Sequence, residues 1–354
     1  MSFDESAEHA RDLHRDALVV DSHSGLIVDV VRRRADGERA VMRNVHLPRL
    51  RDGGVDIVGL KVGGDTIFAP VYKTDRHLNV ALWNLEVIYQ EVEESEGELV
   101  ITTTVEDMRR AKREGKVGLL LSFEGARPIE DKLEFLRLFY RFGVRRFQLT
   151  WNFRNRIADG CGEEHALGGV TQFGVQVLGE LEKLGMVLDL AHLSESSFWA
   201  VLEHHHGPLL VSHANARVLC DHPRNLSDDQ IKALAARGGV VGVVFYGRFI
   251  SKDEPTIAKL VDHIDHIAGL VGVDHVGLGT DYTDDHYDLM GAGLSAYPDL
   301  YPEDLWKKYP PNLSTYAETG NLTIELVQRG YSDAEIRKIL GENYLRVFDR
   351  VFRS

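Results

Sequence analysis

Short apolar runs alternate with longer amphipathic segments along most of the chain, and this alternation is its main secondary-structure signal. The runs are nearly continuous in apolar residues, as expected of strands that are buried on both faces of a parallel sheet. We predict eight strands, at 17–23, 55–61, 117–123, 145–150, 186–191, 208–212, 239–246 and 275–280. Eight such strands, each followed by a crossover, predict an α/β chain folded as a closed (β/α)8 barrel of the TIM type.

The amphipathic segments carry helix start and stop signals. Several begin with a Ser, Thr or Asp cap and end at Gly. We predict helices at 78–94, 133–143, 171–185, 194–205, 227–238 and 258–272, with closing helices at 323–330 and 332–352. No Pro-, Gly- or Ser-rich linker divides the chain, so we expect a single barrel domain over residues 1–354. Its C-terminal part, about 283–354, should form a long loop over the barrel mouth, followed by helices packed on the barrel.

Composition and charge narrow the class of protein. The chain has 354 residues, of which 44% are hydrophobic and 27% charged, so it can bury a large core. Its formal net charge of -14 argues against nucleic acid as a partner, because nucleic-acid-binding proteins present clustered Lys and Arg. Two cysteines are too few for a disulfide framework, and neither a signal peptide nor a membrane-length apolar run is recognisable. We therefore expect a soluble cytoplasmic protein with no membrane partner, and the sequence allows a homodimer.

Chemically active side chains follow many of the predicted strands. The carboxyl ends of the strands carry the active site in barrels of this type. The polar or aromatic residues at these ends are His23, Glu124, Trp151, Asn152, His192, His213, Tyr246 and Asp281. Three histidines and two carboxylates would converge on one small volume, and imidazole with carboxylate suits a divalent ion such as zinc. A lone histidine of this kind is more often a core residue satisfied by a hydrogen bond, but five coincidences favour a metal site.

Other catalytic motifs are absent from the sequence. GLGTD at 277–281 lacks the glycine spacing and the following helix of a dinucleotide-binding loop, and there is no P-loop phosphate-binding motif. No GxSxG nucleophile elbow occurs, and Cys161 is better explained as a loop thiol than as a nucleophile.

Taken in order, these strand ends and several further segments resemble the renal or membrane dipeptidases, zinc peptidases of the amidohydrolase superfamily. The resemblance covers nearly the whole chain, in the segments LVVDSHS, LPRLRDGGV, LLLSFEGA, FQLTWNFRNRIADGC, DLAHLS, LLVSHANA, HPRNLSDDQI, GVVFY, GLGTDY and GENYLRVF. Each segment is a weak signal, but their collinear order is a strong one. The resemblance implies a zinc-dependent dipeptidase that cleaves the amide bond of short peptides with metal-activated water.

The same resemblance implies roles for individual residues. Glu124 would bridge two zinc ions, and His23 would bind the first of them. His192 and His213 would bind the second. Asp281 would handle the substrate amino group and the proton, so Asp281 and Glu124 are the expected catalytic carboxylates.

Substrate-binding roles follow in the same way. Arg224 matches the arginine that holds the substrate carboxylate, with help from Tyr246. Trp151 and Asn152 occupy the part of the site that follows the fourth predicted strand. A bidentate guanidinium would fix the register of the substrate and limit substrates to short ones. Without the resemblance, an ion pair with an aspartate of the following helix explains Arg224 equally well.

Two positions depart from the family pattern. The aspartate expected two residues after His23 is Gly25, which weakens the first metal site because a divalent ion needs negative ligands to offset its dehydration. Trp151 lies where the family commonly has His or Tyr, and an indole can only donate a hydrogen bond. Both changes leave the second zinc site intact. Lys61, at the end of the second predicted strand, has two explanations: its ammonium could replace the first cation, or it could extend to solvent.

Three functions are compatible with these residues. The first is a zinc dipeptidase-like hydrolase with one or two ions, which has a small peptide as its substrate. The second is a metal-dependent amidohydrolase that acts on another small amide such as an N-acyl amino acid, because Gly25 and Trp151 reshape the pocket. The third is a homologue that binds a ligand without turnover.

Overall fold

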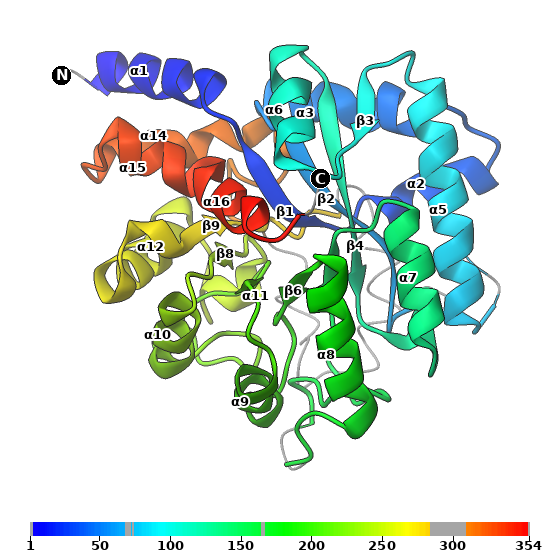
Figure 1. The fold of residues 1–354 in the computed structure, drawn as a ribbon. Coiled ribbons are helices and arrows are strands. Elements are labelled where there is room, and N and C mark those ends of the chain that lie inside the picture. Colours follow the sequence, from blue (N-terminus) through cyan, green and yellow to red (C-terminus); the bar gives the residue numbers. More distant parts are fainter. Residues whose placement is uncertain (1–2, 68–71, 73, 164–166, 284–308, 353–354) are drawn as a thin grey trace.

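The computed structural model describes residues 3–67, 72, 74–163, 167–283 and 309–352. Within these residues the parallel strands form a barrel, and helices surround it on the outside (Figure 1). The strands of the sheet are β1 (Val20–Ser24), β2 (Ile57–Gly64), β3 (Leu99–Ile101), β4 (Val117–Glu124), β5 (Arg146–Gln148), β6 (Val187–Asp189), β7 (Leu209–Leu210), β8 (Val241–Val243) and β9 (Val276–Leu278).

Strand pairing follows the order β7, β6, β5, β4, β2, β1, β9 and β8. A parallel bridge between Val211 and Val241 joins the two ends of this order, so the barrel closes. This confirms the predicted (β/α)8 fold, and each of the eight predicted strands overlaps one observed strand, although β1, β2 and β4 extend beyond the predicted ends. β3 was not predicted. It pairs with the first part of β4.

The helices connect the strands and cover the outside of the barrel (Figure 1). They are α1 (Phe3–Asp16), α2 (Ile27–Ala35), α3 (Leu47–Asp52), α5 (His77–Glu94), α6 (Val105–Arg113), α7 (Leu133–Arg141), α8 (Gln172–Leu184), α9 (Glu195–His204), α10 (Asp228–Ala236), α11 (Gly247–Ile250), α12 (Ile257–Val271), α14 (Gly320–Gln328), α15 (Asp333–Arg337) and α16 (Asn343–Asp349). Short 3-10 or π-helical segments are η1 (Met42–His46), η2 (Arg127–Ile129), η3 (Val273–His275), η5 (Tyr316–Glu318) and η6 (Lys338–Glu342).

The capping signals in the sequence correspond to real helix starts. The side chains of Thr171, Ser194, Ser227 and Thr256 each accept a hydrogen bond from a backbone N–H in the first turn of the helix that follows. All six helices predicted between the strands are present, whereas α1, α2, α3, α6 and α11 were not predicted.

The C-terminal segment differs in part from its prediction. The closing helix predicted at 332–352 is divided into α15, η6 and α16. Gly341, within η6, packs so closely on the chain at Leu18 that a Cβ atom there would overlap the Leu18 carbonyl oxygen. The predicted loop over the barrel mouth begins at residue 283, and its residues 284–308 lie outside the described residues. No helix in the described ranges is long and apolar enough to cross a membrane.

Tyr344 of α16 ties the C-terminal helix to the barrel. Its side chain is fully buried and fills the space that side chains at Gly242 and Gly277 would need. A Cβ atom at Gly277 would lie 2.5 Å from Cε2 of the tyrosine ring. The tyrosine hydroxyl donates to the Leu278 carbonyl oxygen at 2.9 Å and lies 2.9 Å from the Ser22 hydroxyl. Packing and hydrogen bonding therefore act together at this contact.

We expect Tyr344→Ala to lower the free energy of unfolding by about 4 kcal/mol, because the change leaves a cavity between two strands. Tyr344→Phe keeps the ring and removes only the hydroxyl, so it should cost about 1 kcal/mol. Urea unfolding monitored by tryptophan fluorescence measures both losses. Equal losses in the two variants would show that the hydroxyl, and not the ring, stabilises the contact.

Candidate metal centre

The carboxyl ends of five strands bring the predicted metal ligands together. His23 lies in β1 and Glu124 ends β4, whereas His192, His213 and Asp281 follow β6, β7 and β9. The Oε1 atom of Glu124 is central: it lies 3.3, 3.5 and 3.9 Å from the Nε2 atoms of His23, His192 and His213, in that order. His23 Nε2 also lies 3.7 Å from Asp281 Oδ1. The three histidines and Glu124 are buried, and the Asp281 side chain is 24% exposed.

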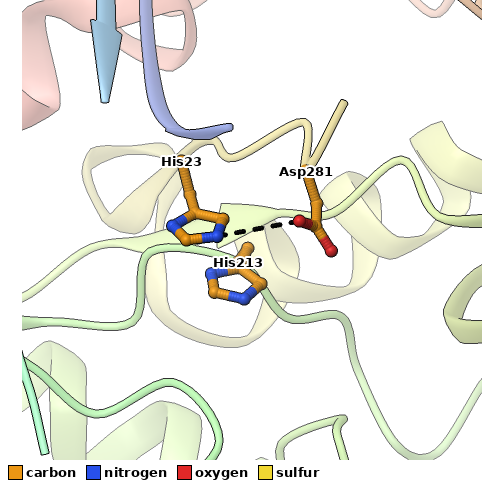
Figure 2. A group of neighbouring side chains, drawn as sticks. All are labelled: His23, His213 and Asp281. Carbon is orange, nitrogen blue, oxygen red and sulfur yellow. Dashed lines mark ion pairs between the residues drawn. The ribbon is translucent and has the colours of Figure 1, made fainter. Parts of the chain in front are cut away.

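These side chains form two overlapping groups that could hold a metal ion. The Glu124 group consists of Glu124, His192 and His213, and the Asp281 group consists of His23, His213 and Asp281. In each group the ligand atoms lie within 4.8 Å of one another. Figure 2 shows the Asp281 group, in which the two imidazole rings are stacked with centroids 4.0 Å apart and the carboxylate lies to one side. His213 belongs to both groups.

The outer ring nitrogens of the Glu124 group face hydrogen-bond acceptors. His192 Nδ1 lies 2.6 Å from Asn152 Oδ1, and His213 Nδ1 lies 2.7 Å from Ser212 Oγ. Both rings can therefore donate from Nδ1 and keep a lone pair on Nε2. The two Nε2 atoms are 2.9 Å apart. When both rings carry their proton on Nδ1, two lone pairs face each other beside a carboxylate, and a cation among them would remove the repulsion. This donor set fits a divalent ion.

Burial keeps the two imidazoles of this group neutral. It lowers the pKa of His192 to about 3 and that of His213 well below its ordinary value. Burial alone would raise the pKa of Glu124, but the Lys61 ammonium and the neighbouring His23 outweigh it, so the pKa lies well below its ordinary value. Two neutral imidazoles and an ionised carboxylate are the protonation states that metal ligands require.

Lys61 of β2 lies inside the site. Its ammonium nitrogen is 2.6 Å from Glu124 Oε2, and its side chain is only 13% exposed. Of the two explanations that the sequence allowed for Lys61, extension to solvent is therefore wrong.

Arg146 is a residue of the site that we did not single out in the sequence. It lies in β5, its side chain is fully buried, and it forms an ion pair with Asp189 of β6. Its NH2 group lies 2.9 Å from Ser122 Oγ and 3.2 Å from His23 Nδ1. No motif marks such an arginine. The available signal is the strand sequence RFQ, in which two polar side chains alternate with an apolar one and so face the same side of the sheet.

Asp281 and His192 share an unusual backbone conformation. Their φ angles are 56° and 67°, in the left-handed region that non-glycine residues rarely adopt and that is common at functional sites. Burial raises the pKa of Asp281 to about 6, although its side chain keeps some exposure, and the neighbouring His23 opposes this increase. A carboxyl group with a pKa close to neutrality can both accept and return a proton.

Arg224 is buried next to the Glu124 group. One of its terminal nitrogens donates to the His213 carbonyl oxygen at 3.1 Å. Its Nε atom has no hydrogen-bond partner, and the guanidinium has no carboxylate partner, among the described residues. Asp228 and Asp229 pair with other side chains, so the alternative explanation of Arg224 as a partner of this helix is wrong.

The other predicted substrate-binding residues occupy three different positions. Trp151 is half-buried and borders the site, with its ring centroid 5.9 Å from that of His192. Asn152 is fully buried behind His192, so the structure places it against a candidate ligand and away from the open site. Tyr246 is buried against the Phe249 ring.

Known proteins resemble this chain in sequence and in fold. Residues 7–309 match the family model described as membrane dipeptidase, peptidase family M19. The dipeptidase verJ of Clonostachys rogersoniana is 30% identical over 305 residues, which cover 82% of this chain and 73% of that protein. The crystal structure of an amidohydrolase from Pseudomonas aeruginosa has a TM-score of 0.81 at 27% identity, and covers 97% of this chain and 99% of its own. A metallo peptidase from Rhodobacter sphaeroides, liganded with a phosphinate mimic of the dipeptide L-Ala-D-Ala, has a TM-score of 0.81 at 22% identity, and covers 95% of this chain and 100% of its own.

The family match spans most of the chain and includes every predicted metal ligand from His23 to Asp281. The predicted enzyme class, a hydrolase that acts as a metallopeptidase, agrees with the family and with its dipeptidase relatives. This chain therefore belongs to the membrane dipeptidase family, peptidase family M19, whose members are metal-dependent peptidases.

Proposed function

We propose that this chain is a zinc-dependent dipeptidase that holds its ion at Glu124, His192 and His213. The observation that carries the proposal is the geometry of this group: the Nδ1 atoms of the two imidazoles lie 2.6 and 2.7 Å from side-chain oxygens, and their Nε2 atoms lie 2.9 Å apart beside a carboxylate. Histidine ligands of metals commonly donate their second ring N–H to such acceptors. When bound, a zinc ion supplies a Lewis acid for the amide carbonyl and lowers the pKa of water.

Arg224 supports a substrate with a free carboxylate. A buried guanidinium costs free energy unless it is paired. The C-terminal carboxylate of a dipeptide would supply that partner through charge-assisted hydrogen bonds, to the Nε atom among others. The Rhodobacter sphaeroides peptidase, which shares the fold, is liganded with a dipeptide mimic. We therefore assign dipeptides as the substrate class.

Asp281 is the proton carrier in this proposal. It lies on the exposed side of the buried cluster, and its pKa of about 6 suits it to accept a proton from water and to return it to the leaving amine. Trp151, at the border of the site, can donate a hydrogen bond to a substrate but cannot transfer a proton. The carboxylate of Asp281 also favours a substrate with an ammonium group, which dipeptides have and N-acyl amino acids lack.

The purified protein should hydrolyse L-Ala-L-Ala or L-Ala-D-Ala, lose this activity after dialysis against EDTA, and regain it with zinc sulfate. N-acetyl-alanine should react at least about tenfold more slowly, because it offers no ammonium group to Asp281. Release of free alanine measures all three reactions. Activity that survives chelation would contradict the proposal, and faster turnover of the N-acetyl compound would favour the alternative amidohydrolase.

Arg224→Met should lower kcat/KM for L-Ala-L-Ala by about 30- to 1,000-fold, since losing one partner of a buried charge pair costs about 2–4 kcal/mol. The C-terminal amide of the same dipeptide should be affected far less, because it has no carboxylate. Arg156→Met is the matched control: Arg156 is 69% exposed and pairs with Asp131. An equal loss of kcat/KM on the dipeptide and on its C-terminal amide would show that Arg224 does not bind the substrate carboxylate.

Asp281→Asn should lower kcat by about 100- to 10,000-fold, the usual contribution of general acid–base catalysis. Asparagine tolerates the left-handed backbone at this position, so the fold should be retained. The zinc content should stay at the wild-type value, because Asp281 lies outside the Glu124 group. An unchanged rate on dipeptides would rule out Asp281 as the proton carrier.

A further inference from the structure

The two carboxylate oxygens of Glu124 contact different partners. Oε1 faces the three imidazoles of the site, whereas Oε2 lies 2.6 Å from the Lys61 ammonium. In the two-ion arrangement that the family resemblance implies, this glutamate bridges the ions. Lys61 therefore brings a cation of the chain itself to one of the bridging oxygens.

The hydrogen bonding of His23 also argues against a metal ion between His23 and Glu124. Arg146 NH2 lies 3.2 Å from His23 Nδ1, and a guanidinium can only donate a hydrogen bond. Nδ1 must therefore accept, which places the ring proton on Nε2. Nε2 is the atom that faces Glu124 and Asp281, at 3.3 and 3.7 Å, and a protonated nitrogen has no lone pair for a metal. A histidine that binds a metal through Nε2 carries its ring proton on Nδ1. His192 and His213 can both adopt this form.

The packing around Gly25 leaves little room for the aspartate that the family pattern has at this position. A Cβ atom added at Gly25 would lie 2.6 Å from Cγ2 of Thr283, a buried side chain. The Gly25 N–H donates to the Tyr282 carbonyl oxygen at 2.8 Å, which holds these two segments together. The carboxylate ligand of the family pattern does not fit here unless Thr283 moves.

His213 and the local charge also limit the number of metal ions that the site can hold. A neutral imidazole has one ring lone pair, so His213 can serve the Glu124 group or the Asp281 group but not both. One divalent ion together with Lys61 already carries more positive charge than the carboxylates of Glu124 and Asp281 neutralise. A second divalent ion would add repulsion without adding a negative ligand.

We propose that this chain binds a single metal ion, at Glu124, His192 and His213, and that Lys61 replaces the other ion as the cation on Glu124. His23 is then not a metal ligand: its Nε2 atom faces Glu124 and Asp281 at 3.3 and 3.7 Å and has no hydrogen-bond partner among the described residues. The inference rests on the dipeptidase function proposed above and specifies how many ions that function uses.

Metal content tests the inference independently of turnover. The full chain is incubated with excess zinc sulfate, desalted, and analysed by inductively coupled plasma mass spectrometry. We expect one zinc ion per wild-type chain. His23→Gln should also keep one ion, because glutamine can accept from Arg146 through its oxygen and donate through its amide group. The matched variant His192→Gln loses a ligand of the proposed site and should retain well below one ion.

Lys61→Met and Lys61→Arg test whether the positive charge of Lys61 is needed on Glu124. Both variants should keep one ion per chain, because the Glu124 group is intact. Lys61→Met should lower kcat by about 10- to 100-fold, the usual result of displacing a catalytic group slightly. Lys61→Arg restores the positive charge and should recover most of kcat. Thermal unfolding of both variants shows whether the fold is retained.

Four outcomes would count against these assignments. Two zinc ions per wild-type chain would overturn the inference and leave the proposed dipeptidase function in place. Loss of the ion in His23→Gln, with thermal unfolding at the wild-type temperature, would also overturn it. A wild-type kcat in Lys61→Met would overturn the assignment of Lys61. A wild-type chain with neither bound metal nor metal-dependent dipeptide turnover would overturn the proposed function, and the inference with it.

Discussion

The buried carboxylate of Glu124 is the interaction on which the rest of the site depends. An ionised carboxylate in a protein interior is unstable unless positive charge and hydrogen-bond donors surround it. Lys61 supplies charge at one oxygen, and the ring of His23 faces the other. The Nε2 atoms of His192 and His213 also approach that second oxygen, so these side chains form a group that could hold a metal ion. Glu124 thus contacts both the buried lysine of the barrel and the histidines of the candidate metal centre.

The barrel allows so many polar groups to lie close together. Parallel pairing places Glu124 level with Gln148 of β5, and the same pattern continues around the sheet, so the strand ends meet at a single rim. Below the rim, Asp21 of β1 accepts hydrogen bonds from the Thr280 N–H at 2.8 Å and the Tyr316 hydroxyl at 2.5 Å. These buried contacts brace β1 against β9. The side chains that follow the two strands are therefore held in a defined relation before any ligand arrives.

Some of the segments that carry the family resemblance contribute packing rather than chemistry. GENYLRVF includes Gly341, which allows close contact with the chain at Leu18, and Tyr344, which fills the space beside Gly242 and Gly277. Few side chains would fit at these glycines, because the neighbouring backbone and the tyrosine ring fill the space. The division of the closing helix at η6 and the short strand β3 were not predicted, because both depend on contacts with distant segments that leave no local pattern.

The sequence by itself determined the order of the barrel strands and the residues at their carboxyl ends. Each strand is a local apolar signal, and a parallel barrel brings all of these ends to one face whatever the intervening loops do. Only the tertiary structure decided which partners face the ring nitrogens of each histidine, where the ammonium of Lys61 lies, and what occupies the space beside Gly25. Those outcomes depend on Arg146, Asn152 and Thr283, which reach the site from other segments. A hydrogen bond acts over about 3 Å, so these contacts exist only once the folded chain has brought distant residues together.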